Sequence, residues 1–289
     1  MSKKTLVCIH IMPTEIEMFQ RFMVRYKKAM AYLDENDDVT ILATLNLNPK
    51  LTDWEKSEIS QQYFIDIFEE SLKDVPSIQQ LIVDESLWGT TQQKREAINL
   101  PFDQFIFVDT DIAINEQLLK YQLNASYYME GMYILSPSIP RWWDVSWDSL
   151  VDSKFINGPL GTAFEKEVFD ESFNHQPQQV KILNVNPIKF GCGMHTLYSK
   201  EFWQFVGIPE SFGGYGPEDT YALHAANHAN TRGYDIKQYR LDDIYIVEDY
   251  SDRTPPFIDK LHIIGNKKEQ KDKADSLLFA EVDIFARKI

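Results

Sequence analysis

Hydrophobic residues in the first third of the chain form short unbroken runs, separated by longer segments with a helical repeat. Such runs predict buried strands, and they occupy residues 5–12, 39–45, 80–83 and 105–108. The segments between them predict helices at residues 14–33, 59–72 and 91–100. Thr14 and Glu17 have the spacing of a capping box that begins the first helix. This alternation predicts an α/β fold with a parallel sheet and helices on both faces, in which ligands bind beyond the carboxyl ends of the strands.

The pattern is less regular in the second half of the chain. The stretch from Arg141 to Gly216 is rich in Gly, Pro and Trp. Beyond it, the spacing predicts a helix at residues 218–230, strands at 234–240 and 244–247, and an amphipathic helix at 272–289. No internal repeat or linker interrupts the chain, so we expect one compact domain.

Composition narrows the class of protein. The chain has 289 residues, 44% of them hydrophobic, which is enough for the core of a single domain. Its formal net charge of −15 repels phosphate backbones, so we expect no binding to bulk nucleic acid. The two cysteines, Cys8 and Cys192, are too few for a disulfide framework and favour a cytoplasmic protein. No apolar run reaches the roughly 18 residues of a transmembrane helix, and residues 5–12 fit a first strand better than a signal peptide.

Two carboxylates follow the strand at residues 105–108, in the sequence Asp109-Thr110-Asp111. Where the chain leaves the sheet, both can converge on one hard cation, and oxygen ligands suit Mg²⁺ or Mn²⁺. A turn or a helix cap would also explain an Asp-x-Asp at this place.

A second pair of acids, Glu218 and Asp219, follows the glycine-rich turn at residues 213–217 and begins a predicted helix. An ordinary loop with helix-starting acids is the simpler interpretation, because the helix dipole favours negative charge there. The density of glycines among bulky residues favours a functional turn.

These pieces together resemble a known family. The stretches Phe190-Gly-Cys-Gly-Met-His195, Tyr198 to Gly207, and Ile208 to Asp219 are similar to a segment that β-1,4-galactosyltransferases and polypeptide N-acetylgalactosaminyltransferases share. Asp-Thr-Asp lies upstream, in the expected order, and residues 89–99 resemble the segment that precedes this motif in inverting enzymes of the GT-A fold. The resemblance extends over about half the chain, from Leu81 to Leu223.

The resemblance implies a metal-dependent glycosyltransferase with a single GT-A catalytic domain over residues 1–289, in which a Rossmann-like mixed sheet is flanked by helices. The nucleotide-sugar-binding half would be residues 1–115, the acceptor half 116–265, and the C-terminal helix 266–289. The donor would be a UDP-linked sugar, and the acceptor a glycan, lipid or protein. Nothing in the sequence indicates an oligomeric state.

The family's roles map onto matching positions. Asp111 would bind the metal, Asp109 would contact the metal, the ribose or the sugar, and Asp219 would be the catalytic base with Glu218 on the donor sugar. Three departures leave the sugar specificity open: Thr220 replaces a further acid, Tyr215 replaces Trp, and Ile208-Pro-Glu210 replaces Phe-Asp-Glu.

Further residues have expected roles at the donor. The spacing His262-Ile-Ile-Gly265-Asn-Lys267 is similar to a segment that family-8 retaining enzymes use for metal and diphosphate. It implies His262 as a third metal ligand, which favours Mn²⁺ over Mg²⁺, and Lys267 as a phosphate ligand. It also leaves retention open beside the inversion that the galactosyltransferase pattern implies.

Two more features have a functional and a structural explanation. Lys94 or Arg95 would hold the donor diphosphate, unless both belong to a solvated helix face. The aromatic cluster of Trp142, Trp143 and Trp147 would form a lid over the donor or pack in the core.

Three alternatives remain. A sugar-1-phosphate nucleotidylyltransferase would carry a Gly-rich, Arg-containing loop after the first strand, where this chain has Pro13-Thr14-Glu15-Ile16. A non-catalytic carbohydrate-binding protein of the same fold would not need both acid pairs. A glycoside hydrolase also uses two carboxylates, but would not explain Asp-Thr-Asp at a strand end.

Overall fold

A computed structural model describes residues 3–76, 78–84, 89–138, 181–185, 194–248, 255–265 and 267–289. Within these residues one mixed sheet has nine strands, in the order β3-β2-β1-β4-β8-β6-β9-β5, with β7 paired to β9. The strands are β1 (Thr5–Ile11), β2 (Val39–Asn46), β3 (Ile78–Asp84), β4 (Gln104–Val108), β5 (Ile112–Ile114), β6 (Tyr133–Ser138), β7 (Lys181–Val185), β8 (His195–Ser199) and β9 (Lys237–Glu248).

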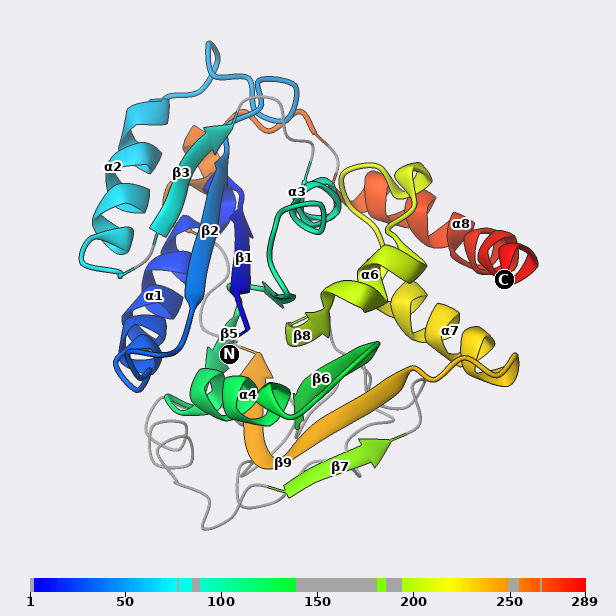
Figure 1. The fold of residues 1–289 in the computed structure, drawn as a ribbon. Helices are drawn as coiled ribbons and strands as arrows, with labels where there is room; N and C mark the ends of the chain where they lie inside the picture. Colours follow the sequence, from blue (N-terminus) through cyan, green and yellow to red (C-terminus); the bar gives the residue numbers. More distant parts are fainter. Residues whose placement is uncertain are drawn as a thin grey trace, which may run out of the picture.

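Helices cover both faces of this sheet (Figure 1). They are α1 (Ile16–Met30), α2 (Gln61–Leu72), α3 (Thr90–Ala97), α4 (Leu118–Tyr127), α6 (Lys200–Val206), α7 (Glu218–Thr231) and α8 (Lys267–Lys288). Short 3₁₀ turns occur at Pro13–Glu15, Glu210–Phe212 and Ile258–Lys260. No helix in the described part of the chain is both long enough and apolar enough to span a membrane.

The register of the parallel strands places their carboxyl ends at one edge. Thr5 of β1 pairs with Val39 of β2 and with Gln104 of β4, so these three strands begin level with one another. Strand β8 then runs antiparallel to β4 and pairs His195 with Val108. The residues that follow β1 and β4 therefore meet at the same edge of the sheet, where ligands bind in folds of this kind.

Alternate residues of the central strands pack on opposite faces, as their unbroken apolar runs predict. Val7 and Ile9 belong to a core with the apolar faces of α1, α2 and α4. Leu6 and Cys8 belong to a second core, which includes residues from α6, α7 and α8. Figure 1 shows α1 and α2 on one side of the sheet and α7 and α8 on the other. The predicted α/β sheet with two helical layers is confirmed.

Three local predictions differ from the structure. The expected capping box of Thr14 and Glu17 does not begin the helix. Instead the Met12 N–H donates to the Glu15 carboxylate at 2.8 Å, because the chain leaves β1 through a 3₁₀ turn that starts at Pro13. Residues 237–248 form one strand rather than two, since β9 continues through a register shift between its pairings with Pro137 and Ser138. Helix α8 begins at Lys267, five residues before the apolar repeat that predicted it.

Candidate active site

Both acid pairs identified in the sequence line one cavity of about 670 Å³. Asp109 and Asp111 reach it from the turn that follows β4, and Glu218 and Asp219 from the first turn of α7. The strand order explains the meeting, because β4 ends at the carboxyl edge of the sheet and α7 begins beside that edge. Two motifs that lie far apart in the chain thus face a shared space.

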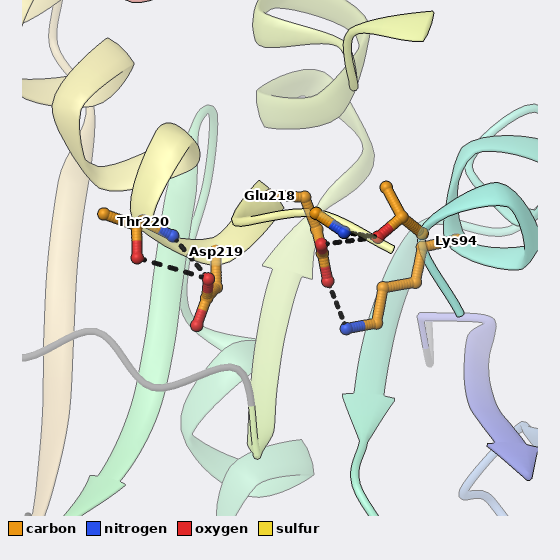
Figure 2. A network of polar contacts seen from close by, with 6 residues as sticks. Lys94, Glu218, Asp219 and Thr220 are labelled. Atoms are coloured by element: carbon orange, nitrogen blue, oxygen red, sulfur yellow. Dashed lines mark hydrogen bonds and ion pairs between the residues drawn. The ribbon is translucent and has the colours of Figure 1, made fainter. Parts of the chain in front are cut away.

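Glu218 is held on both of its carboxylate oxygens. Its Oε1 lies 2.5 Å from the ammonium nitrogen of Lys94, and its Oε2 accepts a hydrogen bond from the Thr91 hydroxyl at 2.8 Å. The side chains of Lys94 and Glu218 are each 5% exposed. Figure 2 shows Lys94 reaching across from α3 to Glu218. Glu218 therefore anchors α7 to α3. It also lines the cavity, so its expected place at the donor sugar stays a prediction.

The same helix α3 holds the glycine-rich turn in place. The Thr91 hydroxyl accepts a hydrogen bond from the Gly216 N–H at 2.8 Å, and the Thr91 N–H donates to the Gly214 carbonyl at 3.0 Å. Thr91 thus connects the turn to Glu218 through one hydroxyl group. The N-terminus of α3 and the turn before α7 form one hydrogen-bonded unit.

Arg95 also belongs to this unit. Its guanidinium donates to the carbonyl oxygens of Ile208 at 3.2 Å, Pro209 at 2.8 Å and Gly213 at 3.1 Å. These three bonds commit the side chain to the loop before α7. The structure therefore does not bring Arg95 to the cavity as a diphosphate ligand, and Lys94 reaches the cavity wall already paired with Glu218.

Asp219 has a different environment from its neighbour. Its Oδ1 accepts hydrogen bonds from the Thr220 N–H at 2.6 Å and the Thr220 hydroxyl at 3.4 Å. Within the described residues no donor reaches its Oδ2. Burial, followed by the charge of Glu218, raises the pKa of Asp219. Figure 2 shows Asp219 on the Thr220 side of the helix start, away from Lys94.

The strand-end acids form a half-buried pair. Burial raises the pKa of Asp109 to about 7 against the opposing charge of Lys94, and the neighbouring carboxylates of Asp111 and Glu218 add to the rise. Two carboxylates suit a divalent ion that shares its coordination with substrate phosphates and water, as Mg²⁺ commonly does. Among the described residues, no three His, Cys, Asp or Glu side chains gather closely enough to bind a metal by themselves. Asp109 and Asp111 thus fit a divalent ion that takes its remaining ligands from other groups.

His262 is not part of this cavity. It is exposed, its N–H donates to the Ser57 hydroxyl at 3.0 Å, and its carbonyl accepts from the Asp53 N–H at 2.8 Å. A bridge between Ile263 and Thr52 ties the segment to the loop that follows β2. This differs from the expected third metal ligand, because these contacts hold His262 against the loop that follows β2, and His262 does not line the cavity with Asp109 and Asp111.

Other predicted residues lie outside what the structure describes. Lys267 begins α8, but its side chain is not among the described ones. The aromatic cluster of Trp142, Trp143 and Trp147 and the glycine pair around Cys192 also lie outside the described residues. Their expected roles stay predictions.

The cavity has lining residues that the sequence analysis did not single out. His10 is the next-to-last residue of β1, and Lys271 and Asp275 belong to α8. A signal for His10 existed, since it stands near the carboxyl end of a central strand, where ligands bind in such sheets. Lys271 offered none, because one lysine in a polar helix is typical of a solvated surface.

Comparison with known proteins supports the fold. Neither a protein-family model nor a curated protein matches the sequence. The mannosyltransferase PcManGT from Pyrobaculum calidifontis, solved with GDP-Man and Mn²⁺, aligns over 88% of this chain with a TM-score of 0.52 and 12% identity. Residues 1–349 of S. aureus TarS align over 99% of this chain with a TM-score of 0.48 and 12% identity.

The chain is shorter than these proteins. It spans 59% of the mannosyltransferase and 72% of the TarS fragment. At such low identity the likeness to the mannosyltransferase shows the fold alone. The particular resemblance to β-1,4-galactosyltransferases and polypeptide N-acetylgalactosaminyltransferases stays a prediction. The chain shares its mixed α/β fold with this mannosyltransferase, and the fold class predicted from the sequence is confirmed.

Proposed function

We propose that this protein transfers a sugar from a nucleotide-sugar donor to a hydroxyl acceptor, with a divalent metal at Asp109 and Asp111. The observation that carries the proposal is the shared cavity, which these two acids line together with Asp219, whose Oδ2 receives no hydrogen bond from the residues that the structure describes. A glycosyltransferase needs both functions in one space: negative ligands for a metal on the diphosphate, and a base for the acceptor. The likeness in fold to a mannosyltransferase supports the assignment.

The two acid pairs have separate tasks in this proposal. A divalent ion at Asp109 and Asp111 would supply Lewis-acid stabilisation of the departing nucleoside diphosphate. Asp219 accepts the proton of the attacking hydroxyl as the new glycosidic bond forms and the bond to the diphosphate breaks. Adjacent residues at a helix start point about 100° apart. In this proposal Asp219 faces the acceptor, while Glu218, which also lines the cavity, is paired with Lys94.

The proposal extends to donor and stereochemistry. Direct displacement with Asp219 as base gives inversion at the anomeric carbon, and we therefore propose an inverting enzyme. We propose a UDP-linked donor from the galactosyltransferase-like motif. The mannosyltransferase of similar fold was solved with GDP-Man, so guanosine donors are the first competitors to test. Mn²⁺ is the preferred ion in this proposal and Mg²⁺ the alternative.

A thermal-shift panel tests the function directly. UDP- and GDP-sugars are each added with Mn²⁺, with Mg²⁺, or with EDTA, and Tm is recorded. A donor should raise Tm only when a divalent ion is present, because ligands of the folded state stabilise it by mass action. The best donor is then incubated with protein and metal, and free nucleoside diphosphate is measured. Absence of any metal-dependent shift and of any donor cleavage would contradict the proposal.

A further inference from the structure

Lys94 connects the two acid motifs of the cavity. Its ammonium group lies 2.5 Å from Glu218 and 5.4 Å from the ring centre of Phe107, which is two residues before Asp109 on β4. One side chain from α3 therefore contacts both the strand that carries the first acid pair and the helix that carries the second.

The pairing with Glu218 is a strong constraint on Lys94. Both side chains are 5% exposed, and a buried ammonium without a partner is costly, because the protein interior solvates charge poorly. Burial by itself lowers the pKa of Lys94. The carboxylates of Glu218 and then Asp109 raise the pKa by more than burial lowers it, so the pKa lies above its ordinary value. Lys94 is thus a charged group that needs Glu218, and it has little freedom to move to a diphosphate.

The constraint extends to Asp219. Glu218 and Asp219 are consecutive at the start of α7, so fixing the first fixes the backbone of the second. Glu218 also accepts from the Thr91 hydroxyl, which in turn accepts from the Gly216 N–H. The carboxylate that faces the substrate therefore sits on backbone held by a buried ion pair and two hydrogen bonds.

We propose that Lys94 and Glu218 are positioning residues, which hold Asp219 at the angle needed to take the acceptor proton and do not themselves bind the donor. This inference rests on the proposed function. It assigns Lys94 a different role from the diphosphate ligand expected from its sequence position. It also assigns Glu218 a different role from a sugar ligand.

Kinetics separate positioning from donor binding. Lys94→Met removes the charge and keeps the length of the side chain, and it should lower kcat for transfer by roughly 10²-fold, since small misplacement of a catalytic group is that costly. The donor Kd, measured by titration calorimetry with Mn²⁺, should stay within about twofold of wild type. Lys271→Met is the contrasting variant: Lys271 is an exposed lysine on the same cavity, and its loss should weaken the donor Kd rather than lower kcat. A tenfold weaker donor Kd in Lys94→Met with unchanged kcat would overturn the proposal.

Unfolding tests the pair without reference to activity. Lys94→Met and Glu218→Met each leave one buried charge unpaired and should each lower Tm by roughly 10 °C. The double variant Lys94→Met/Glu218→Met removes both charges of the pair, so its Tm should return most of the way to the wild-type value. The double variant also covers the case in which a single variant does not fold. Additive losses in the double variant would overturn the pairing.

The activity of the double variant completes the test. Its fold should be restored, yet kcat should stay low, because Glu218→Met also removes the bond to Thr91 that orients the start of α7. Wild-type kcat in a stable double variant would overturn the positioning role. A wild-type protein that cleaves no donor would instead overturn the proposed function. The Tm values of the variants would still show whether Lys94 and Glu218 stabilise each other.

Discussion

Gly89 lies directly against the glycine-rich turn, so that a Cβ on Gly89 would stand 2.7 Å from Cδ2 of Tyr215 and closer still to the Gly214 carbonyl oxygen. The backbone of Gly89 is extended, with a φ of 162°, so close approach rather than an unusual dihedral angle requires glycine here. The first turn of α3 can reach Gly214 and Glu218 only because this position has no side chain.

We therefore expect Gly89→Ala to disturb the site as well as the fold. The methyl group would push α3 away from the turn and weaken the bonds of Thr91 to Gly214 and Gly216. Tm should fall by several degrees, in the range of overpacked sites, and transfer should fall with it. Glu96→Ala, an exposed change on the same helix, is the control and should leave Tm within about one degree. Equal Tm values for Gly89→Ala and Glu96→Ala would show that the site can accommodate a methyl group at residue 89.

Thr91→Val tests the hydroxyl that joins the turn to α7. The substitution keeps the shape of the side chain but removes its hydroxyl group. That hydroxyl donates to the Glu218 carboxylate and accepts from the Gly216 N–H. Each buried polar group left without its partner costs about 1–3 kcal/mol. The free energy of unfolding, measured in urea, should fall by an amount in this range. Thr231→Val removes an exposed hydroxyl bond at the far end of α7 and should cost far less.

Substitutions at the expected metal ligands Asp111 and His262 distinguish the prediction made from the sequence from the one made from the structure. Asp111→Asn should abolish the Mn²⁺-dependent rise of Tm with donor and lower transfer by at least about 10²-fold, because Lewis-acid stabilisation contributes several kcal/mol. The motif at residues 262–267 predicts a similar loss for His262→Ala. The structure predicts a small effect, since His262 lies against the loop after β2 and does not line the cavity. Full transfer in excess EDTA would contradict metal dependence altogether.

Lys271 is the cation we expect to meet the donor diphosphate. Lys94 and Arg95 are both committed to other partners, whereas Lys271 is exposed on α8 and lines the cavity. Lys271→Met should weaken the donor Kd by roughly tenfold, the value of one charge-assisted hydrogen bond. Lys273→Met changes a neighbouring exposed lysine that does not line the cavity and should leave Kd unchanged. Similar Kd values for both variants would exclude Lys271 from donor binding.

The sequence predicted the parts of the fold that depend on local periodicity. Unbroken apolar runs identified β1, β2, β3 and β4, which pair in parallel with one another. The site acids were found because they follow a strand and a glycine-rich turn. The partners of Lys94 and Arg95 were not predictable, since they lie 113 or more residues away in the chain and depend on how α3 meets α7. The expectation that His262 lies at the metal site came from the local spacing of residues 262–267. Its position in the structure depends instead on a distant contact, the pairing of Ile263 with Thr52.

Asp219→Asn is the decisive change at the proposed base. The amide has nearly the same shape and still accepts from the Thr220 N–H, but it cannot take a proton at the operating pH. Turnover should fall by roughly 10²–10⁴-fold, while the donor Kd and the Mn²⁺-dependent Tm shift persist, because Asp109 and Asp111 are unchanged. Glu218→Gln should behave differently and lower Tm as well, since it weakens the buried contact with Lys94. An NMR spectrum of the wild-type product should show the anomeric configuration opposite to that of the donor, as direct displacement requires. A product with the donor's configuration would exclude Asp219 as the base of a single displacement and would leave the glycosyltransferase assignment itself in place.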